Sequence, residues 1–256
     1  MNGIVQATAL KIPLTNYSAT LVYCDPPRNL GRNEGNSSDR LNLPDYEDFT
    51  IQWIDEAYRC LRVEGWFVIC TYHKGRMLYE NILKKNYPDL EYDFEIIWDY
   101  NFGLYTKQRF VPSHDNILVY RRGNPHFYWT QVAVTSQRLK IGDSRADLRG
   151  RTPSSVWPIP RVPGNSKARS FLIDTYRRTC QPIELTTRIL KAFTIGGPKA
   201  HQRDLVLDLF CGTGSMALSA KTYGRDYFGL DICFHYCSEA KRRNDEDWLR
   251  IFYDEI

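Results

Sequence analysis

The sequence lacks an apolar run long enough to cross a membrane, and no signal peptide is recognisable at its start. Its seven cysteines are odd in number and are scattered through apolar runs, which does not suit a disulfide framework. Internal repeats and low-complexity tracts are also absent. We therefore expect reduced thiols in a cytoplasmic protein that has no membrane partner.

A strong excess of charge is lacking too, because the formal net charge is only +4. A nucleic-acid partner must therefore be inferred from where basic residues gather. They gather between about residues 107 and 169, where Phe127, Tyr128, Trp129 and Trp157 interrupt them. Basic residues interleaved with aromatic ones suit backbone contact and base stacking better than a merely solvated surface. The candidates for nucleic-acid contact are Lys107, Arg109, Arg138, Lys140, Arg161, Lys167 and Arg169.

What the sequence does contain is enough apolar material for a full core, at 43% of 256 residues. Short apolar runs alternate with stretches of helical spacing, which predicts an α/β protein built on one sheet. The predicted strands lie at about 21–24, 66–70, 94–98, 116–120, 204–208 and 227–231, and the predicted helices at about 48–61, 75–85, 182–193 and 215–223.

One of these strands has a polar and rigid end. The run that begins at Leu21 stops at Asp25, which is followed by Pro26 and Pro27. The prolines fix their own φ angles and favour extended geometry before them, so Asp25 is held stiffly beside carbonyl groups outside any ladder. The stretch is either a loop that offers acceptors to a ligand or an ordinary turn in which Asp25 is a cap.

A second strand runs from Asp204 to Asp208 and leads into a glycine turn. Gly212 and Gly214 allow the backbone to approach a ligand closely, and a helix follows from Ser215. The next strand ends at Asp231, about twenty residues after the turn, where a carboxylate can accept hydrogen bonds from ribose hydroxyls. The pattern is typical of the first half of a nucleotide-binding unit.

Two kinds of cofactor fit this unit. The spacing Gly212-x-Gly214-x-x-Ala217 matches the dinucleotide fingerprint, so a nicotinamide oxidoreductase is one alternative. Asp208 argues against a dinucleotide, because dinucleotide-binding strands are normally apolar up to the turn. A carboxylate there favours a cationic ligand, and S-adenosylmethionine carries both a sulfonium and an ammonium group.

With both stretches in view, the chain resembles the amino-methyltransferases of DNA, which methylate the exocyclic amino group of adenine or cytosine. The resemblance rests on Asp25-Pro26-Pro27, on the loop from Asp208 to Gly214, on Asp231 and on the segment Cys180–Leu185. The catalytic motif precedes the cofactor loop, which is the order of the permuted, beta-type subgroup. It implies a doubly wound, mostly parallel sheet of the S-adenosylmethionine-dependent methyltransferase type.

The resemblance also implies roles for individual residues. Asp25 and the Pro26 carbonyl would accept hydrogens from the amino group of a base flipped out of DNA, and Pro27 would stiffen the loop. Relatives carry an aromatic residue next, which stacks on the base, whereas this chain has Arg28. S-adenosylmethionine would be bound by Asp208, Phe210, Cys211, Gly212, Thr213, Gly214 and Asp231, with Pro182 and Cys24 beside them.

We expect one domain over residues 1–256, with a catalytic half at about 1–120, a basic target-recognition insertion at about 121–175 and a cofactor half at about 180–256. An Asp at the head of the motif favours adenine over cytosine by family analogy. A partner nuclease and a homodimer are left open. No metal is expected, because Cys233-x-His235-x-Cys237 lacks a second ligand pair.

Two further alternatives concern activity. The chain could be a catalytically silent relative that binds DNA and S-adenosylmethionine, with Arg28 blocking or repositioning the base. It could also be a methyltransferase that acts on RNA. Methyl transfer to DNA separates both alternatives from the first interpretation.

Overall fold

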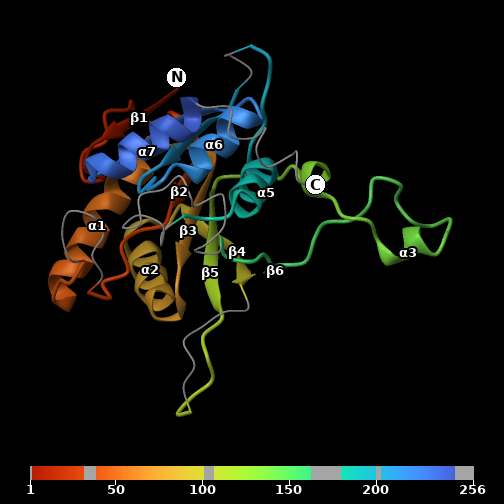
Figure 1. Cartoon of the computed structure of the whole chain (residues 1–256), viewed down its shortest axis with the longest axis horizontal. Helices are drawn as coiled ribbons and strands as arrows, with labels where there is room; N and C mark the ends of the chain where they lie inside the picture. Colours follow the sequence, from red (N-terminus) through yellow and green to blue (C-terminus); the bar gives the residue numbers. More distant parts are fainter. Residues whose placement is uncertain (1, 32–38, 101–106, 163–179, 200–202, 246–256) are drawn as a thin grey trace.

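A computed structural model describes residues 2–31, 39–100, 107–162, 180–199 and 203–245 (Figure 1). They contain one eight-stranded sheet with the strand order β1-β8-β7-β2-β3-β5-β4-β6. None of the helices in these ranges combines the length and the apolar character needed to span a membrane. The elements are β1 (Asn2–Gln6), β2 (Ala19–Cys24), α1 (Leu43–Cys60), β3 (Leu61–Thr71), α2 (His73–Asn86), β4 (Leu90–Asp99), β5 (His114–Arg122), η1 (Trp129–Val132), α3 (Gln137–Lys140), β6 (Val156–Pro158), α5 (Ile183–Phe193), β7 (Leu205–Asp208), α6 (Ser215–Thr222), β8 (Asp226–Asp231) and α7 (Phe234–Asp245).

The sheet is mostly parallel, as the sequence predicted. Strands β1, β8, β7, β2 and β3 all pair in parallel. Strand β5 runs antiparallel to both of its neighbours, β3 and β4, and β6 is parallel to β4. The amino end of β5 therefore lies at the same edge of the sheet as the carboxyl ends of the other strands.

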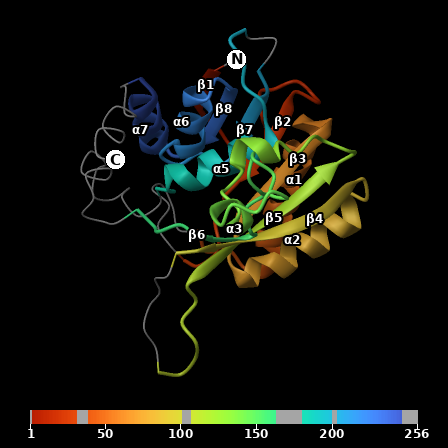
Figure 2. The same ribbon diagram turned by 90° about the vertical axis from the view of Figure 1, so that its right-hand side faces the viewer.

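Helices cover both faces of the sheet, which makes the fold doubly wound (Figure 2). Alternate side chains of β2 point to opposite faces, as the pleat of a strand requires. Val22 and Cys24 belong to the core under α1 and α2, where Trp53 is fully buried. Leu21 and Tyr23 belong to the core under α5 and α6. The predicted fold class is confirmed.

Two edge strands were missed from the sequence for the same reason. Only Ile4 is buried in β1, and only Trp157 is buried in the three residues of β6, so neither shows an apolar pattern. Helix α1 also begins earlier than predicted, at Leu43. Asn42 caps it, since its side chain accepts a hydrogen bond from the Asp45 amide, and Pro44 in the first turn suits a helix start.

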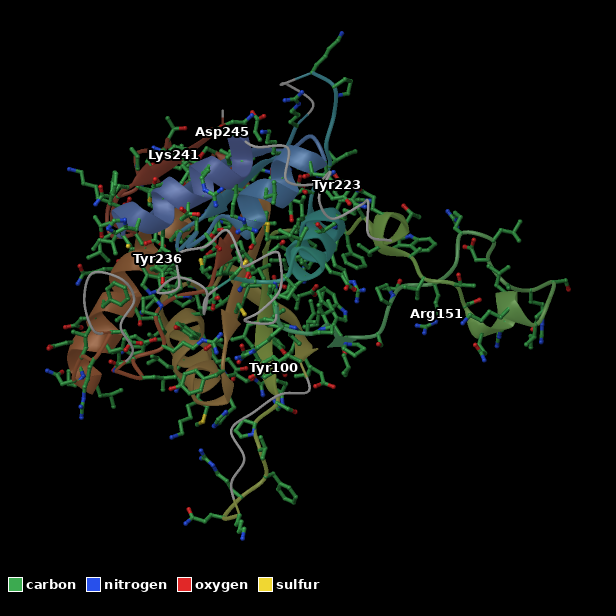
Figure 3. All side chains as sticks on the ribbon, in the orientation of Figure 1. Tyr100, Arg151, Tyr223, Tyr236, Lys241 and Asp245 are labelled. Carbon is green, nitrogen blue, oxygen red and sulfur yellow. The ribbon has the colours of Figure 1, made fainter. Side chains whose placement is uncertain are left out.

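A long excursion leaves the sheet between β5 and β6. Figure 1 shows the segment around α3 standing well away from the body of the protein, and Figure 3 labels Arg151 on it. An isolated bridge between Val134 and Arg151 closes the segment at its base. Arg138 and Lys140, two of the candidates for nucleic-acid contact, lie exposed on α3.

Gly214 precedes α6 in the left-handed conformation, with φ of 79°. A Cβ atom there would lie 2.7 Å from the Cβ of Ala240 on α7. We expect Gly214→Ala to lower the free energy of unfolding by about 2–4 kcal/mol, from backbone strain and the clash together. Gly142→Ala is the matched control, because Gly142 has φ of 72° and nothing within 4 Å of the added atom. Urea unfolding should show a clearly smaller loss of the free energy of unfolding for Gly142→Ala than for Gly214→Ala. Equal losses in the two variants would contradict a role for the clash with Ala240.

Candidate functional site

A cavity of about 240 Å³ lies at the edge of the sheet where the parallel strands end. Its lining follows the strand order, with Asp231 from β8, Asp208 from β7, Asp25 after β2, Asp115 from β5 and Trp98 from β4. Tyr236 of α7, labelled in Figure 3, also lines the cavity. The structure thus brings the two predicted motifs together.

The glycine loop is fixed to the acid at the end of β8. The amide of Gly212 donates to Asp231 Oδ2 over 3.0 Å, and the amide of Cys233 donates to Asp231 Oδ1 over 2.8 Å. Burial raises the pKa of Asp231 above its ordinary value, and these two amides oppose the rise. Each carboxylate oxygen keeps a second lone pair, so Asp231 can still accept hydrogen bonds from a ligand's hydroxyl groups.

The loop is also held from the side of α7. The guanidinium of Arg243 donates from one nitrogen to the Thr213 carbonyl over 2.5 Å and to Thr213 Oγ1 over 3.0 Å. Arg243 is buried, so its charge is directed at this loop rather than at solvent. A loop held by both the β8 acid and the α7 guanidinium is preorganised for close approach of a ligand.

Asp208 is a buried carboxylate with few partners. Its side chain accepts a long hydrogen bond of 3.4 Å from the Phe210 amide, and no Arg or Lys of the described ranges pairs with it. Burial raises its pKa well above the ordinary value, and Asp25 and Asp231 raise it further. An under-compensated buried carboxylate is suited to a cationic ligand, so the sulfonium and ammonium groups of S-adenosylmethionine fit this wall of the cavity.

Asp25 is held by a side chain that sequence reasoning did not single out. Gln181 donates from Nε2 to Asp25 Oδ2 over 2.8 Å and accepts at Oε1 from the Tyr23 hydroxyl over 2.7 Å. Its carbonyl accepts from Ser215 Oγ over 2.9 Å, which ties it to the start of α6. Burial raises the pKa of Asp25, and the charge of Arg28 partly offsets this rise.

Arg28 makes a bidentate ion pair with Asp115, a residue that the sequence analysis had not proposed for the site. The nitrogens Nη1 and Nη2 lie 3.0 and 2.9 Å from the two carboxylate oxygens, and Nη2 lies 3.4 Å from Asp25 Oδ1. The Asp115 side chain is only 2% exposed. Arg161 Nη2 lies 3.6 Å from the same carboxylate, and its guanidinium stacks 3.7 Å above the Tyr100 ring.

The other predicted site residues divide into three groups. Pro26, Pro27, Phe210, Cys211 and Thr213 line the cavity.

Cys24, Pro182 and Gly214 do not line it. Cys24 faces the core under α1, and Pro182 is the N-cap of α5. Gln181 and Cys180, just before Pro182, line the cavity instead. Cys24, Pro182 and Gly214 therefore do not face the cavity.

Of the candidates for nucleic-acid contact, Lys107 and Arg109 are exposed in the connection between β4 and β5. Arg161 lies in the cavity wall. Lys167 and Arg169 lie outside the described residues.

The Cys233-x-His235-x-Cys237 spacing does not bring its cysteines together. Cys233 packs with Tyr236, whereas Cys237 packs with Ile4 and Cys211 and directs its thiol to the Val5 carbonyl. Within the described ranges, no three His, Cys, Asp or Glu side chains form a group that could hold a metal ion. The two thiols belong to separate packing clusters.

The Gln181 contact leads to a pH prediction. In Gln181→Glu, the Tyr23 hydroxyl keeps an acceptor, but a second carboxylate replaces the amide donor beside Asp25 and must raise its pKa. Any activity that needs ionised Asp25 should then be lost at a higher pH on acidification, with the rate at pH 6 falling more than the rate at pH 8. Tyr23→Phe is the control, since it leaves the Asp25 contact in place. Superimposable pH–rate profiles for parent and Gln181→Glu would contradict the coupling.

Comparisons with known proteins agree with this geometry. The family model described as DNA methylase matches residues 19–242. The chain is 29% identical over 235 residues to the type II methyltransferase M.HpaI of Haemophilus parainfluenzae, covering 92% of this chain and 71% of that protein. It is 27% identical over 263 residues to the DNA adenine methyltransferase YhdJ of Escherichia coli, covering 96% of this chain and 82% of that protein.

Solved structures show the same fold. The PvuII DNA methyltransferase, described as cytosine-N4-specific, superimposes with a TM-score of 0.70 at 17% identity, covering 99% of this chain and 91% of that one. A complex of M1.HpyAVI with S-adenosylmethionine has a TM-score of 0.66 at 17% identity, covering 96% and 100%. The family model spans both the Asp25 loop and the Asp208 loop, and the resemblance predicted from these motifs is confirmed: the chain belongs to the N6/N4 DNA methylase family.

Proposed function

We propose that this DNA methyltransferase moves the methyl group of S-adenosylmethionine to the exocyclic amino group of a base flipped out of DNA, with adenine favoured over cytosine. The observation that carries the proposal is the position of Asp25. It stands in one cavity between the acids of β7 and β8 on one side and Asp115 and Trp98 on the other. A donor and an acceptor can therefore meet at its carboxylate.

The chemistry of the acceptor requires a group such as Asp25. An exocyclic amino nitrogen is a poor nucleophile because its lone pair is delocalised into the ring. An acceptor that binds the amino hydrogens favours the tetrahedral nitrogen of the transition state. Asp25 supplies a carboxylate whose direction Gln181 fixes, and the Pro26 carbonyl is the second acceptor of the proposal.

The other side of the cavity suits the donor. Asp208 would face the positive charge of the cofactor, and Asp231 would accept hydrogen bonds from its ribose. When bound, S-adenosylmethionine supplies the electrophilic methyl group. The protein's contribution is to hold donor and acceptor in line at near-attack distance, which the rigid β2 and β7 strand ends make feasible.

DNA is the proposed substrate because exposed cations lie on the two connections that flank β5. Lys107 and Arg109 lie on the connection between β4 and β5, which leaves the sheet at the cavity edge. Arg138 and Lys140 stand on the excursion at α3. Such positions suit phosphate contacts, which give affinity without reading sequence.

The preference for adenine rests on the Asp that opens the motif and on the name of the E. coli relative, a DNA adenine methyltransferase 27% identical to this chain. The cytosine-N4-specific structure is 17% identical and supports the fold alone.

One observation favours a second candidate function. Nη2 of Arg28 lies 3.4 Å from Asp25 Oδ1 and competes for the oxygen that the amino group needs. If Arg28 kept its contact with Asp25 while the base was bound, the protein would bind cofactor and DNA but would not transfer the methyl group. This second candidate is a catalytically silent DNA-binding protein.

The nucleoside profile of DNA from cells that express the protein tests the proposal. Digested DNA should contain N6-methyladenine above the level in cells without the gene, and purified protein should transfer labelled methyl to unmethylated DNA. N4-methylcytosine alone would correct the target base. DNA retardation without any transfer to DNA would favour the silent relative, and transfer to RNA alone would reject DNA as the substrate.

A further inference from the structure

The guanidinium of Arg28 has two chemically different surfaces, an edge that carries its N–H groups and a flat face. The edge is engaged by carboxylates, with Asp115 on both terminal nitrogens and Asp25 on one of them. Parallel hydrogen bonds of 3.0 and 2.9 Å to one carboxylate hold the guanidinium close to a single plane. The face is what Arg28 can offer to a ligand in the cavity that it lines.

Arg28 is poorly placed to bind a phosphate instead. To do so it would leave Asp115, whose side chain is 2% exposed. An unpaired carboxylate at that depth is strongly destabilising, and Arg161, at 3.6 Å, is the farther of the two cations near it. The pair is therefore a fixed part of the wall, and Arg28 keeps its charge because the two acids raise its pKa against burial.

A fixed, planar and delocalised cation is a stacking surface for an aromatic ring. The same part of the cavity wall contains Trp98, whose indole nitrogen donates to the Ile159 carbonyl over 2.7 Å, so its ring is also held in place. Asp25 follows β2 and Arg28 comes three residues later, so a ring on the guanidinium face lies within reach of the Asp25 carboxylate. A nucleobase has the flat π surface and the amino group that this arrangement requires.

We propose that the Arg28 guanidinium, clamped edge-on by Asp115, is the platform on which the flipped base stacks while its amino group faces Asp25. The inference rests on the proposed function and deepens it. Asp115 acts through Arg28 and is a positioning residue. The contact of Arg28 with Asp25 then keeps the platform beside the acceptor rather than blocking it.

The experiment compares planarity with charge at position 28. Steady-state methyl transfer from labelled S-adenosylmethionine is measured on unmethylated bacteriophage DNA for the parent protein and four variants. They are Arg28→Lys, Arg28→Ala, Asp115→Asn, and the double variant Arg28→Phe with Asp115→Asn. The double variant keeps a flat ring and removes the buried Asp115 charge together with its bidentate partner. Arg121→Lys is the control, because Arg121 pairs with Glu91 at the opposite end of β5.

Arg28→Lys keeps the charge and loses the plane, so kcat/KM for DNA should fall by about 10- to 100-fold, the worth of one base-stacking contact. The double variant should stay within about tenfold of the parent, and Asp115→Asn alone should lower kcat/KM for DNA with the KM for S-adenosylmethionine unchanged. Thermal unfolding and calorimetric binding of S-adenosylhomocysteine check that each variant is folded.

Two patterns overturn the inference alone. In the first, Arg28→Lys is fully active and the folded double variant is inactive, which assigns the role to charge. In the second, Arg28→Ala is faster than the parent, which assigns it to obstruction. A parent protein that transfers no methyl group to DNA overturns the proposed function, and the inference falls with it.

Discussion

Asp25→Asn is expected to slow methyl transfer by about 100- to 10,000-fold, the range for loss of a group that binds a proton or its hydrogen bond in the transition state. The substitution keeps the shape of the side chain and an oxygen for the Gln181 amide. It removes the negative charge and turns an NH₂ group towards the amino group of the base. Labelled methyl transfer to DNA measures the rate, and calorimetry with S-adenosylhomocysteine should show cofactor binding within a few-fold of the parent.

Asp89→Asn is the matched control for this prediction. Asp89 pairs with Arg122 over 3.1 Å just before β4, at the end of the sheet away from the cavity. Its loss should lower stability and leave the transfer rate within about twofold, because the pair lies at the end of the sheet away from the cavity. An Asp25→Asn variant that retained a third of the parental rate would rule out Asp25 as the essential acceptor.

Asp208→Asn is expected to change binding and stability in opposite directions. The carboxylate is buried and its pKa is raised by burial, so ionised Asp208 destabilises the cofactor-free protein. The protonated Asp208 side chain is favoured in the folded protein, so its stabilising contribution is complete below the ordinary pKa of an Asp. This contribution is lost as the pH rises through the raised pKa of the folded state. At neutral pH the neutral amide should therefore raise the melting temperature by a few degrees, at about 2–4 °C per kcal/mol for a chain of this size.

The same substitution should weaken S-adenosylmethionine binding by about 10- to 100-fold, the loss of one hydrogen bond or ion contact to a charged group. Calorimetry gives the affinity, and differential scanning calorimetry gives the melting temperature. Asp204→Asn is the control from the other end of the same strand. Asp204 accepts from Thr20 and from the Ile195 amide, so its loss should lower stability and leave affinity unchanged. A less stable Asp208→Asn protein with parental affinity would contradict the assignment.

Much of the cofactor side could be predicted because its signals are local. The strand before Asp208, the glycine turn and the acid of the next strand are consecutive in the sequence and obey the spacing of one structural unit. The two motifs could be placed together because ligands gather at the carboxyl ends of adjacent strands, and β2 does pair with β7. The reason is geometric and applies whatever the order of the motifs along the chain.

The partners of Arg28 and Asp25 could not be predicted because they are far away in the sequence. Asp115 is 87 residues from Arg28 and directly precedes an apolar run. A polar residue at the start of a strand is common, so nothing in the sequence marked it as a site residue. Placing it requires the antiparallel direction of β5, which hydrophobic pattern does not give. Gln181 is 156 residues from Asp25, and the sequence indicated only that the segment Cys180–Leu185 belongs to the cofactor side.

The reversed direction of β5 has a consequence for which part of the chain can vary beside the cavity. Because β5 runs against its neighbours, the connection from β4 to β5 turns back at the cavity edge rather than at the far edge. Figure 1 shows its described part, residues 107–113, reaching away from the body of the protein. Its length and composition can vary while the ladder between Trp98 and Asp115 stays paired. Sequence changes in this connection can thus accumulate beside Asp115 without altering the register that places its carboxylate against Arg28.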